Sequence, residues 1–137
     1  MLLVFPAAFL VVLVLGSLAI DAAAVFVRQR ELLDAAAAAA NDAATAGLDV
    51  DYLRATGEIR LDPARVEATV VASLAARDAL EELSGDPEWR IVDDRRVEVT
   101  LAARARYVLS PVVPGAPDGR DIEATAVGTA VVLGSGP

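Results

Sequence analysis

The stretch that decides the fold is residues 1–20, MLLVFPAAFLVVLVLGSLAI, which contains no charged side chain. As a helix it rises roughly 30 Å, about the thickness of the hydrocarbon core of a bilayer. A single helix satisfies its own backbone hydrogen bonds, so it can cross lipid without a partner. We therefore predict a membrane span over residues 1–20, formed chiefly by Leu2, Leu3, Leu10, Val11, Leu13, Leu15, Leu18 and Ile20.

Two other kinds of segment contain apolar helices of this sort. A secretory signal peptide has a basic segment ahead of a shorter apolar core, and here no Lys or Arg precedes the run. A helix buried in a soluble domain needs enough surrounding chain, and the remaining sequence is too short to cover it on every side. The length of the run and its lack of charge favour the membrane span.

The helix is predicted to continue well beyond the span. Residues 21–46 contain neither Pro nor Gly, and they begin with Asp21, the first ionisable side chain of the sequence. Alanine, the strongest helix former, dominates the second half of this stretch. Gly47 is expected to end the helix as a C-cap.

Small side chains on this helix offer places where a neighbour can approach. Gly16 lies within the predicted span, and Ala36, Ala40 and Ala44 recur at every fourth residue. Residues spaced in this way share one helix face, and small residues let another helix or a sheet approach closely. The high helix propensity of alanine explains the same composition, so both explanations stay open.

Residues 47–137 follow a pattern typical of a small α+β domain. A helical turn is expected over 49–55, and a second helix begins at Asp62-Pro63, with Asp62 as its N-cap, and extends to about residue 83. Strands are expected at 58–61, 89–92, 96–109 and 121–133. Within the longest of these, apolar side chains alternate with polar ones, which predicts one covered face and one face in water: Val97, Val99, Leu101, Ala103, Ala105 and Tyr107.

The predicted architecture is thus α+β. It consists of a membrane-spanning helix over 1–20, an alanine-rich continuation of that helix over 21–46, and a small domain over 47–137. In that domain one further helix packs on an antiparallel sheet of three to four strands.

The composition excludes several classes of function. The sequence has no Cys and no His, which rules out a thiolate nucleophile, a Cys/His zinc site and the usual base of a serine hydrolase. Twelve Arg and no Lys stand against 20 acidic residues, for a net charge of −8, and aromatic residues are few. This balance argues against nucleic acid as a partner. We expect no enzyme activity, cofactor, metal or small-molecule substrate.

Two groups of carboxylates are close together in the sequence. Asp93, Asp94 and Glu98 surround a predicted hairpin, where paired carboxylates are able to act as acid and base, but the composition favours an ordinary polar turn. Asp49 and Asp51 form a D-x-D fragment without the other oxygen ligands and the glycine of a calcium-binding loop. We assign neither group a catalytic or metal-binding role.

Several motifs follow one another in an order that resembles a known family. They are the apolar span, the acid Asp21 at its exit, the RQREL collar at 28–32 and the alanine-rich stretch 35–44. This arrangement resembles the TadE/TadG-like pilus-assembly proteins of tight-adherence (Flp-type) pili and related bacterial secretion machinery. The LDPAR helix opening at 61–65 and the strand-rich second half are similar to actinobacterial members. The resemblance implies a pilin-like, membrane-anchored component displayed outside the cytoplasm, which acts by assembly.

The resemblance also bears on processing and orientation. Prepilins carry a short basic leader and a glutamate five residues into the mature helix, whereas Phe5 is the fifth residue here; either an upstream start precedes this sequence, or the prepilin peptidase does not process it. Arg28 and Arg30 after the span favour a cytoplasmic C-terminal domain by the positive-inside rule. Because Glu31 and Asp34 stand beside them, this bias is weak, and we expect the extracytoplasmic location that the resemblance implies.

Asp21 stands out among the single residues. An ionisable group at the edge of a bilayer is either solvated by the headgroup region or paired with another group. In a pilin-like assembly its partner would be an arginine or a terminal amine of a neighbouring subunit, which makes Asp21, Arg28 and Arg30 candidates for pairing between subunits.

Two functions from different classes follow. The first is a structural subunit or assembly factor of a bacterial pilus or secretion apparatus, with the lipid bilayer, other pilin-like subunits and further copies of itself as partners. The second is a single-span, membrane-tethered extracytoplasmic binding module unrelated to filaments.

Overall fold

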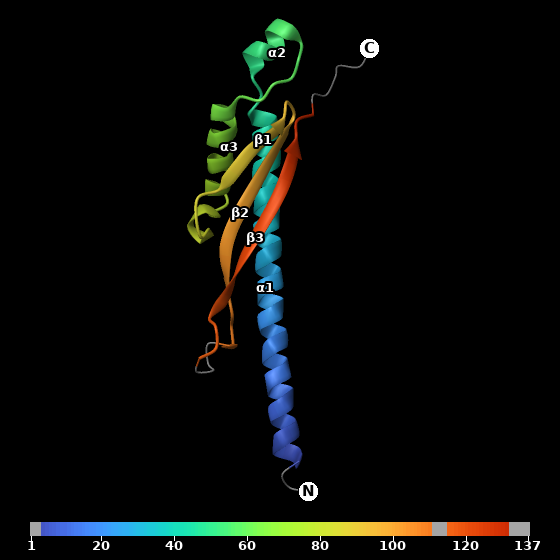
Figure 1. Cartoon of the computed structure of the whole chain (residues 1–137), viewed down its shortest axis with the longest axis vertical. Coiled ribbons are helices and arrows are strands. Elements are labelled where there is room, and N and C mark those ends of the chain that lie inside the picture. Colours follow the sequence, from blue (N-terminus) through green and yellow to red (C-terminus); the bar gives the residue numbers. More distant parts are fainter. Residues whose placement is uncertain (1–3, 111–114, 132–137) are drawn as a thin grey trace.

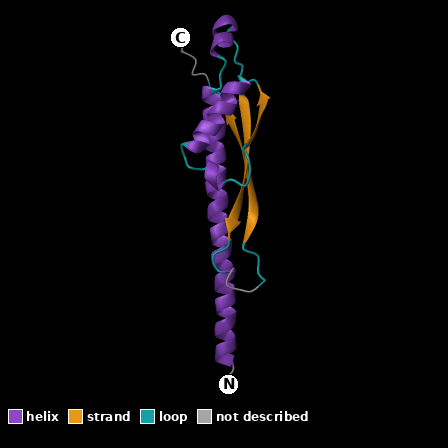
Figure 2. Ribbon diagram, turned by 90° about the vertical axis from the view of Figure 1, so that its left-hand side faces the viewer, coloured by secondary structure: helices purple, strands orange, loops and turns teal. Residues whose placement is uncertain are grey.

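The computed structural model describes residues 4–110 and 115–131 of the chain. Helix α1, Val4–Ala46, runs along most of the molecule and extends far below the other elements (Figure 1). Helices and strands form two layers, with the helices on one face of the sheet (Figure 2). The remaining elements are the helices α2 (Val50–Thr56) and α3 (Pro63–Ala75), the 3₁₀ helix η1 (Leu80–Glu82) and the strands β1 (Glu88–Asp93), β2 (Arg96–Arg106) and β3 (Gly119–Thr129).

The sheet is antiparallel with the strand order β1-β2-β3, so the α+β prediction is confirmed. Strands β2 and β3 pair along their whole length, from Arg96 opposite Thr129 to Arg106 opposite Gly119. Strand β1 is shorter and reaches only as far as Thr100 of β2. The lower part of β2 therefore has a neighbouring strand on one side only.

The end of α1 and the start of α3 follow the predicted capping chemistry, and α2 is capped as well. Helix α1 ends at Ala46, as expected, and the Gly47 amide donates to the Ala43 carbonyl at 2.8 Å. The Asp49 carboxylate caps α2 by accepting from the Tyr52 amide, and Gly57 ends that helix with a left-handed φ of 75°. Asp62 caps α3 in the same way, ahead of a proline in its first turn.

Two predictions between residues 58 and 83 are wrong. The segment 58–61 forms no strand; Leu61 makes a single bridge with Leu48, which closes the α2 segment at its base. Helix α3 ends at Ala75 instead of continuing to about residue 83, and Asp78 turns the chain with a positive φ of 54°. This turn lets the Ser84 amide reach the Ala102 carbonyl at 2.8 Å and so cover part of the β2 edge.

The core lies between the upper half of α1, the sheet and α3. Its largest fully buried side chains are Val66, Val70 and Leu74 of α3 and Val97, Val99 and Leu101 of β2. On α1 the buried face consists of Leu32, Ala36, Ala39, Ala40, Ala43 and Ala44. The face of Ala36, Ala40 and Ala44 thus packs within the chain, with strand β3 among its neighbours. A role of this face in contacts between subunits stays a prediction.

Strand β3 and helix α1 approach one another at the level of their backbones. A Cβ atom added at Gly128 would collide with the carbonyl group of Ala40 and the amide of Asn41. Because backbone atoms cannot move aside as a flexible side chain does, this contact requires glycine at 128. Gly16, by contrast, has nothing within 4 Å of its Cβ position.

We predict that Gly128→Ala destabilises the folded head, because the added methyl group forces strand β3 away from α1. Overpacking of this kind costs about 1–3 kcal/mol. The measurement is thermal unfolding of the full chain in detergent, followed by circular dichroism. Gly85→Ala is the matched control, since an added Cβ there meets no atom within 4 Å. Equal melting temperatures for the two variants would contradict the close contact.

Candidate functional site

The lower part of α1 is an apolar surface without a partner in the described chain. Its large apolar side chains between Val4 and Ile20 point outward on all sides, with exposed fractions from 49% for Val14 to 85% for Phe5. Contiguous apolar surface of this extent marks a contact with a membrane or another protein. Of the residues predicted to form the span, Leu10, Val11, Leu13, Leu15, Leu18 and Ile20 all lie on this surface, whereas Leu2 and Leu3 lie outside the described residues.

Asp21, directly above this surface, is almost fully buried, with 4% of its surface exposed. Its Oδ1 atom accepts hydrogen bonds from the amides of Val108 at 2.7 Å and Leu109 at 2.8 Å. Its Oδ2 atom accepts from the Ser110 amide at 2.9 Å and from the Ser110 hydroxyl. One carboxylate thus binds three consecutive backbone amides and a side chain of the segment that leaves β2.

These hydrogen bonds also determine the protonation of Asp21. The Ser110 hydroxyl, followed by the Leu109 amide, lowers the pKa of the carboxyl group, while its burial acts in the opposite direction. Hydrogen bonds to the charged form favour that form. The carboxylate therefore stays ionised at neutral pH and holds the 108–110 segment against α1.

Sequence reasoning did not find this arrangement. The strand expected over 96–109 ends at Arg106. The amides of Val108 and Leu109 bind Asp21 instead of a neighbouring strand. A buried acid 87 residues away leaves no periodic signal in the sequence. The one local indication was that an ionisable group at the end of an apolar run needs a partner.

The three residues predicted to pair between subunits lie apart in the structure. Asp21 binds the 108–110 segment, and the Arg28 guanidinium bridges Glu31 at 3.2 Å and Glu82 of η1 at 2.5 Å. Arg30 is exposed and forms no ion pair with any other described residue. Their pairing across a subunit interface stays a prediction.

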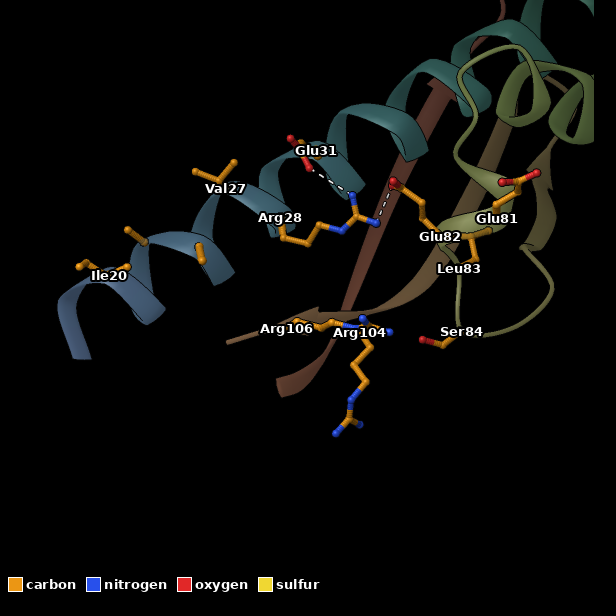
Figure 3. Close-up of a pocket in the computed structure, with 12 residues that line it drawn as sticks. Ile20, Val27, Arg28, Glu31, Glu81, Glu82, Leu83, Ser84, Arg104 and Arg106 are labelled. Atoms are coloured by element: carbon orange, nitrogen blue, oxygen red, sulfur yellow. Dashed lines mark hydrogen bonds and ion pairs between the residues drawn. The ribbon is translucent and has the colours of Figure 1, made fainter. Parts of the chain in front are cut away.

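A groove of about 860 Å³ opens beside this region, between α1, the segment 81–84 and β2 (Figure 3). It lies next to the part of β2 that β1 does not cover. Its helix wall is apolar toward the N-terminus, and the Arg28–Glu82 ion pair bridges α1 and η1 at the other end (Figure 3). The helix wall consists of Ile20, Ala23, Ala24, Val27, Arg28 and Glu31.

Around the hairpin, two of the three acids noted in the sequence, Asp93 and Glu98, are engaged by arginines. Asp93 pairs with Arg96 at 2.6 Å and Glu98 with Arg90 at 2.6 Å, and in both cases the arginine hydrogen bond lowers the pKa of the acid. An acid held in its charged form in this way is a poor proton donor at neutral pH.

The Asp49 carboxylate is engaged in the same manner. It caps α2 and binds Arg60 at 2.6 Å, and the guanidinium of that arginine lies over the Tyr52 ring, 4.0 Å from its centre. Among the described residues, no cluster of three or more acidic side chains is placed to hold a metal ion.

No protein-family model, curated protein or solved structure matches this chain. The architecture itself is pilin-like, with a long apolar N-terminal helix followed by a three-stranded antiparallel sheet. Helix α1 is the one described helix that is long and apolar enough to cross a membrane.

We predict that Asp21→Asn lowers the melting temperature of the full chain at pH 7 by on the order of 10 °C, because an amide cannot accept from all four donors. The folded-state pKa of Asp21 lies below its unfolded value, so its contribution to stability is present above about pH 4 and lost as the pH falls through the lowered pKa. The gap between wild type and variant should therefore shrink on acidification from pH 7 to pH 3, as measured by thermal unfolding in detergent.

Asp51→Asn is the control for this experiment. Asp51 is exposed, and its nearest guanidinium, that of Arg54, is 4.0 Å away. Its replacement should leave the melting temperature nearly unchanged, since exposed pairs of this kind contribute little. A gap for Asp21→Asn that is independent of pH would contradict the role of its charge.

Proposed function

We propose that this chain is a membrane-anchored, pilin-like structural subunit or assembly factor of a bacterial tight-adherence (Flp-type) pilus or related secretion apparatus. It acts through helix packing and subunit contacts, without catalysis. The observation that carries the proposal is the division of one continuous helix into two parts. The lower part is apolar and exposed, and the upper part packs one face into the core of the folded head.

The exposed part of α1 supports a membrane anchor. Residues 4–20 form no core of their own, and in water their apolar surface would favour aggregation. Lipid covers such a surface on every side at once, and the length of this segment suits a bilayer. From Asp21 upward one side of the helix is buried, exposed apolar residues continue on the other side as far as Phe26 and Val27, and charged side chains begin at Arg28.

The shape of the head supports a role in assembly. The sheet and α3 pack on the upper half of α1 only (Figure 1), which leaves the lower half free for neighbouring helices after membrane insertion. Gly16 lies on this free half with open space around it, and such a small residue permits close packing between helices in lipid. The resemblance of the motifs at 21, 28–32, 35–44 and 61–65 to TadE/TadG-like proteins points to the same use.

We predict that Leu13→Arg releases the chain from the membrane fraction of cells, because a charged residue at the centre of a span costs about 2.5–3.5 kcal/mol of insertion free energy. The measurement is fractionation without detergent, followed by detection of the chain in the membrane and soluble fractions. Leu33→Arg is the matched control: Leu33 is an exposed leucine of the same helix, 45% exposed, and lies above the proposed span. Wild-type chain found in the soluble fraction would overturn the anchor.

Subunit contacts are testable with single cysteines, because the natural chain has none. We expect Leu13→Cys to form disulfide-linked products on oxidation of intact membranes, since helices in a shared bundle bring such positions together. Val71→Cys, on an exposed face of α3, should give far less product. Equal yields at both positions, or none at residue 13, would favour the alternative of a tethered binding module. Protease added to intact cells should degrade the head if it is extracytoplasmic.

A further inference from the structure

The segment 107–110 forms an apolar surface on the lower end of the head. The side chain of Val108 is 59% exposed, and Tyr107 and Leu109 are half-buried. The segment carries no charge. Its three amide donors at 108–110 are all satisfied by Asp21, so these groups need no water. Apolar side chains on a backbone whose donors are already bonded are suited to a region poor in water.

The position of this segment along α1 is fixed by the same hydrogen bonds. Asp21 follows Ile20, the last residue of the proposed span, so the segment bound to Asp21 lies where the helix leaves the hydrocarbon. The headgroup layer adds roughly 5–7 Å on each side of a bilayer, and a helix rises 1.5 Å per residue. This layer therefore extends about three to five residues beyond the span, and Asp21 with its bound segment lies inside it.

Two arginines flank the segment at the same end of the sheet. Arg106 immediately precedes it, and Arg120 stands opposite Ala105 on the neighbouring strand. Both are exposed and form no ion pair with other described residues, whereas the nearby Arg104 binds Asp118 at 2.7 Å and Asp121 at 3.1 Å. Arginine beside apolar and aromatic side chains is the composition that favours the lipid interface, where guanidinium groups bind phosphate.

We propose that residues 107–110 form a second membrane contact, which rests in the phospholipid headgroup layer beside the span, with Asp21 as the positioning residue that holds them there. This inference rests on the proposed membrane anchor. The head then stands on the bilayer at two points, the helix and this segment, and its tilt relative to the membrane is restricted.

The test is depth-dependent quenching of a single tryptophan in the full chain, reconstituted into vesicles of phosphatidylcholine and phosphatidylglycerol. Trp89 is first replaced by phenylalanine, and one tryptophan is then introduced as Val108→Trp, Leu10→Trp or Val71→Trp. Lipids with a nitroxide near the headgroup should quench the fluorescence of Val108→Trp by about half, as expected for an interfacial aromatic residue. Val71→Trp, on α3 in the upper part of the head, should be unaffected.

The variants separate this inference from the anchor on which it rests. Leu10→Trp should be quenched by nitroxides deep in the acyl chains, and failure there would overturn the proposed span itself. Quenching at residue 10 together with none at residue 108 would overturn the second contact alone. Adding Asp21→Asn to Val108→Trp should reduce the headgroup quenching while the same change leaves Leu10→Trp quenched as before. Unchanged quenching at residue 108 would overturn the positioning role of Asp21.

Discussion

A single helix, α1, is exposed and apolar in its lower part and packed against the head in its upper part, and the rest of the structure depends on this division. Over residues 4–20 helix α1 is apolar on all sides, whereas over its upper half only one face is buried. Asp21 is the lowest buried residue of α1 among the described residues, and the head covers one face of the helix from there upward. Its carboxylate accepts hydrogen bonds from the 108–110 segment of the head and so joins that segment to α1.

The upper half of α1 shows why alanine is so frequent there. Alanine buries little apolar surface by itself, so this core gains less from each helix residue than a leucine-rich one would. In exchange the backbone of α1 comes close enough to β3 for Ala40 to meet Gly128, and the larger side chains of α3 and β2 fill the remaining space. High helix propensity and close packing, which the sequence alone could not separate, both operate in this segment.

Local chemistry made much of the fold predictable. The alternation in β2, the cap at Asp62 and the end of α1 at Ala46 follow from nearest neighbours in the sequence. Where contacts between distant residues determine the end of an element, the sequence alone did not predict that end. Helix α3 stops early because the chain has to return to the β2 edge at Ala102, although residues 76–83 are good helix formers.

The candidate site divides in the same way. The exposed apolar helix was visible in the composition, since its signal lies within one continuous run. The partners of Asp21 were not, because the hydrogen bonds join residues 87 to 89 positions apart and three of them use backbone amides that any residue type supplies. The bond between Arg28 and Glu82 was hidden for a similar reason, as it depends on the turn after α3.

The α2 segment leaves and returns to the head at one point, where Leu48 bridges Leu61. Its path is closed by backbone contacts, from the Asp49 amide to the Arg60 carbonyl and from the Asp62 amide to the Gly47 carbonyl, each 2.8 Å long. The register of α1 against α3 is consequently set below this junction, independently of how many residues lie above it. Changes in the length or the side chains of this distal tip can therefore be accommodated while the scaffold beneath it keeps the same geometry.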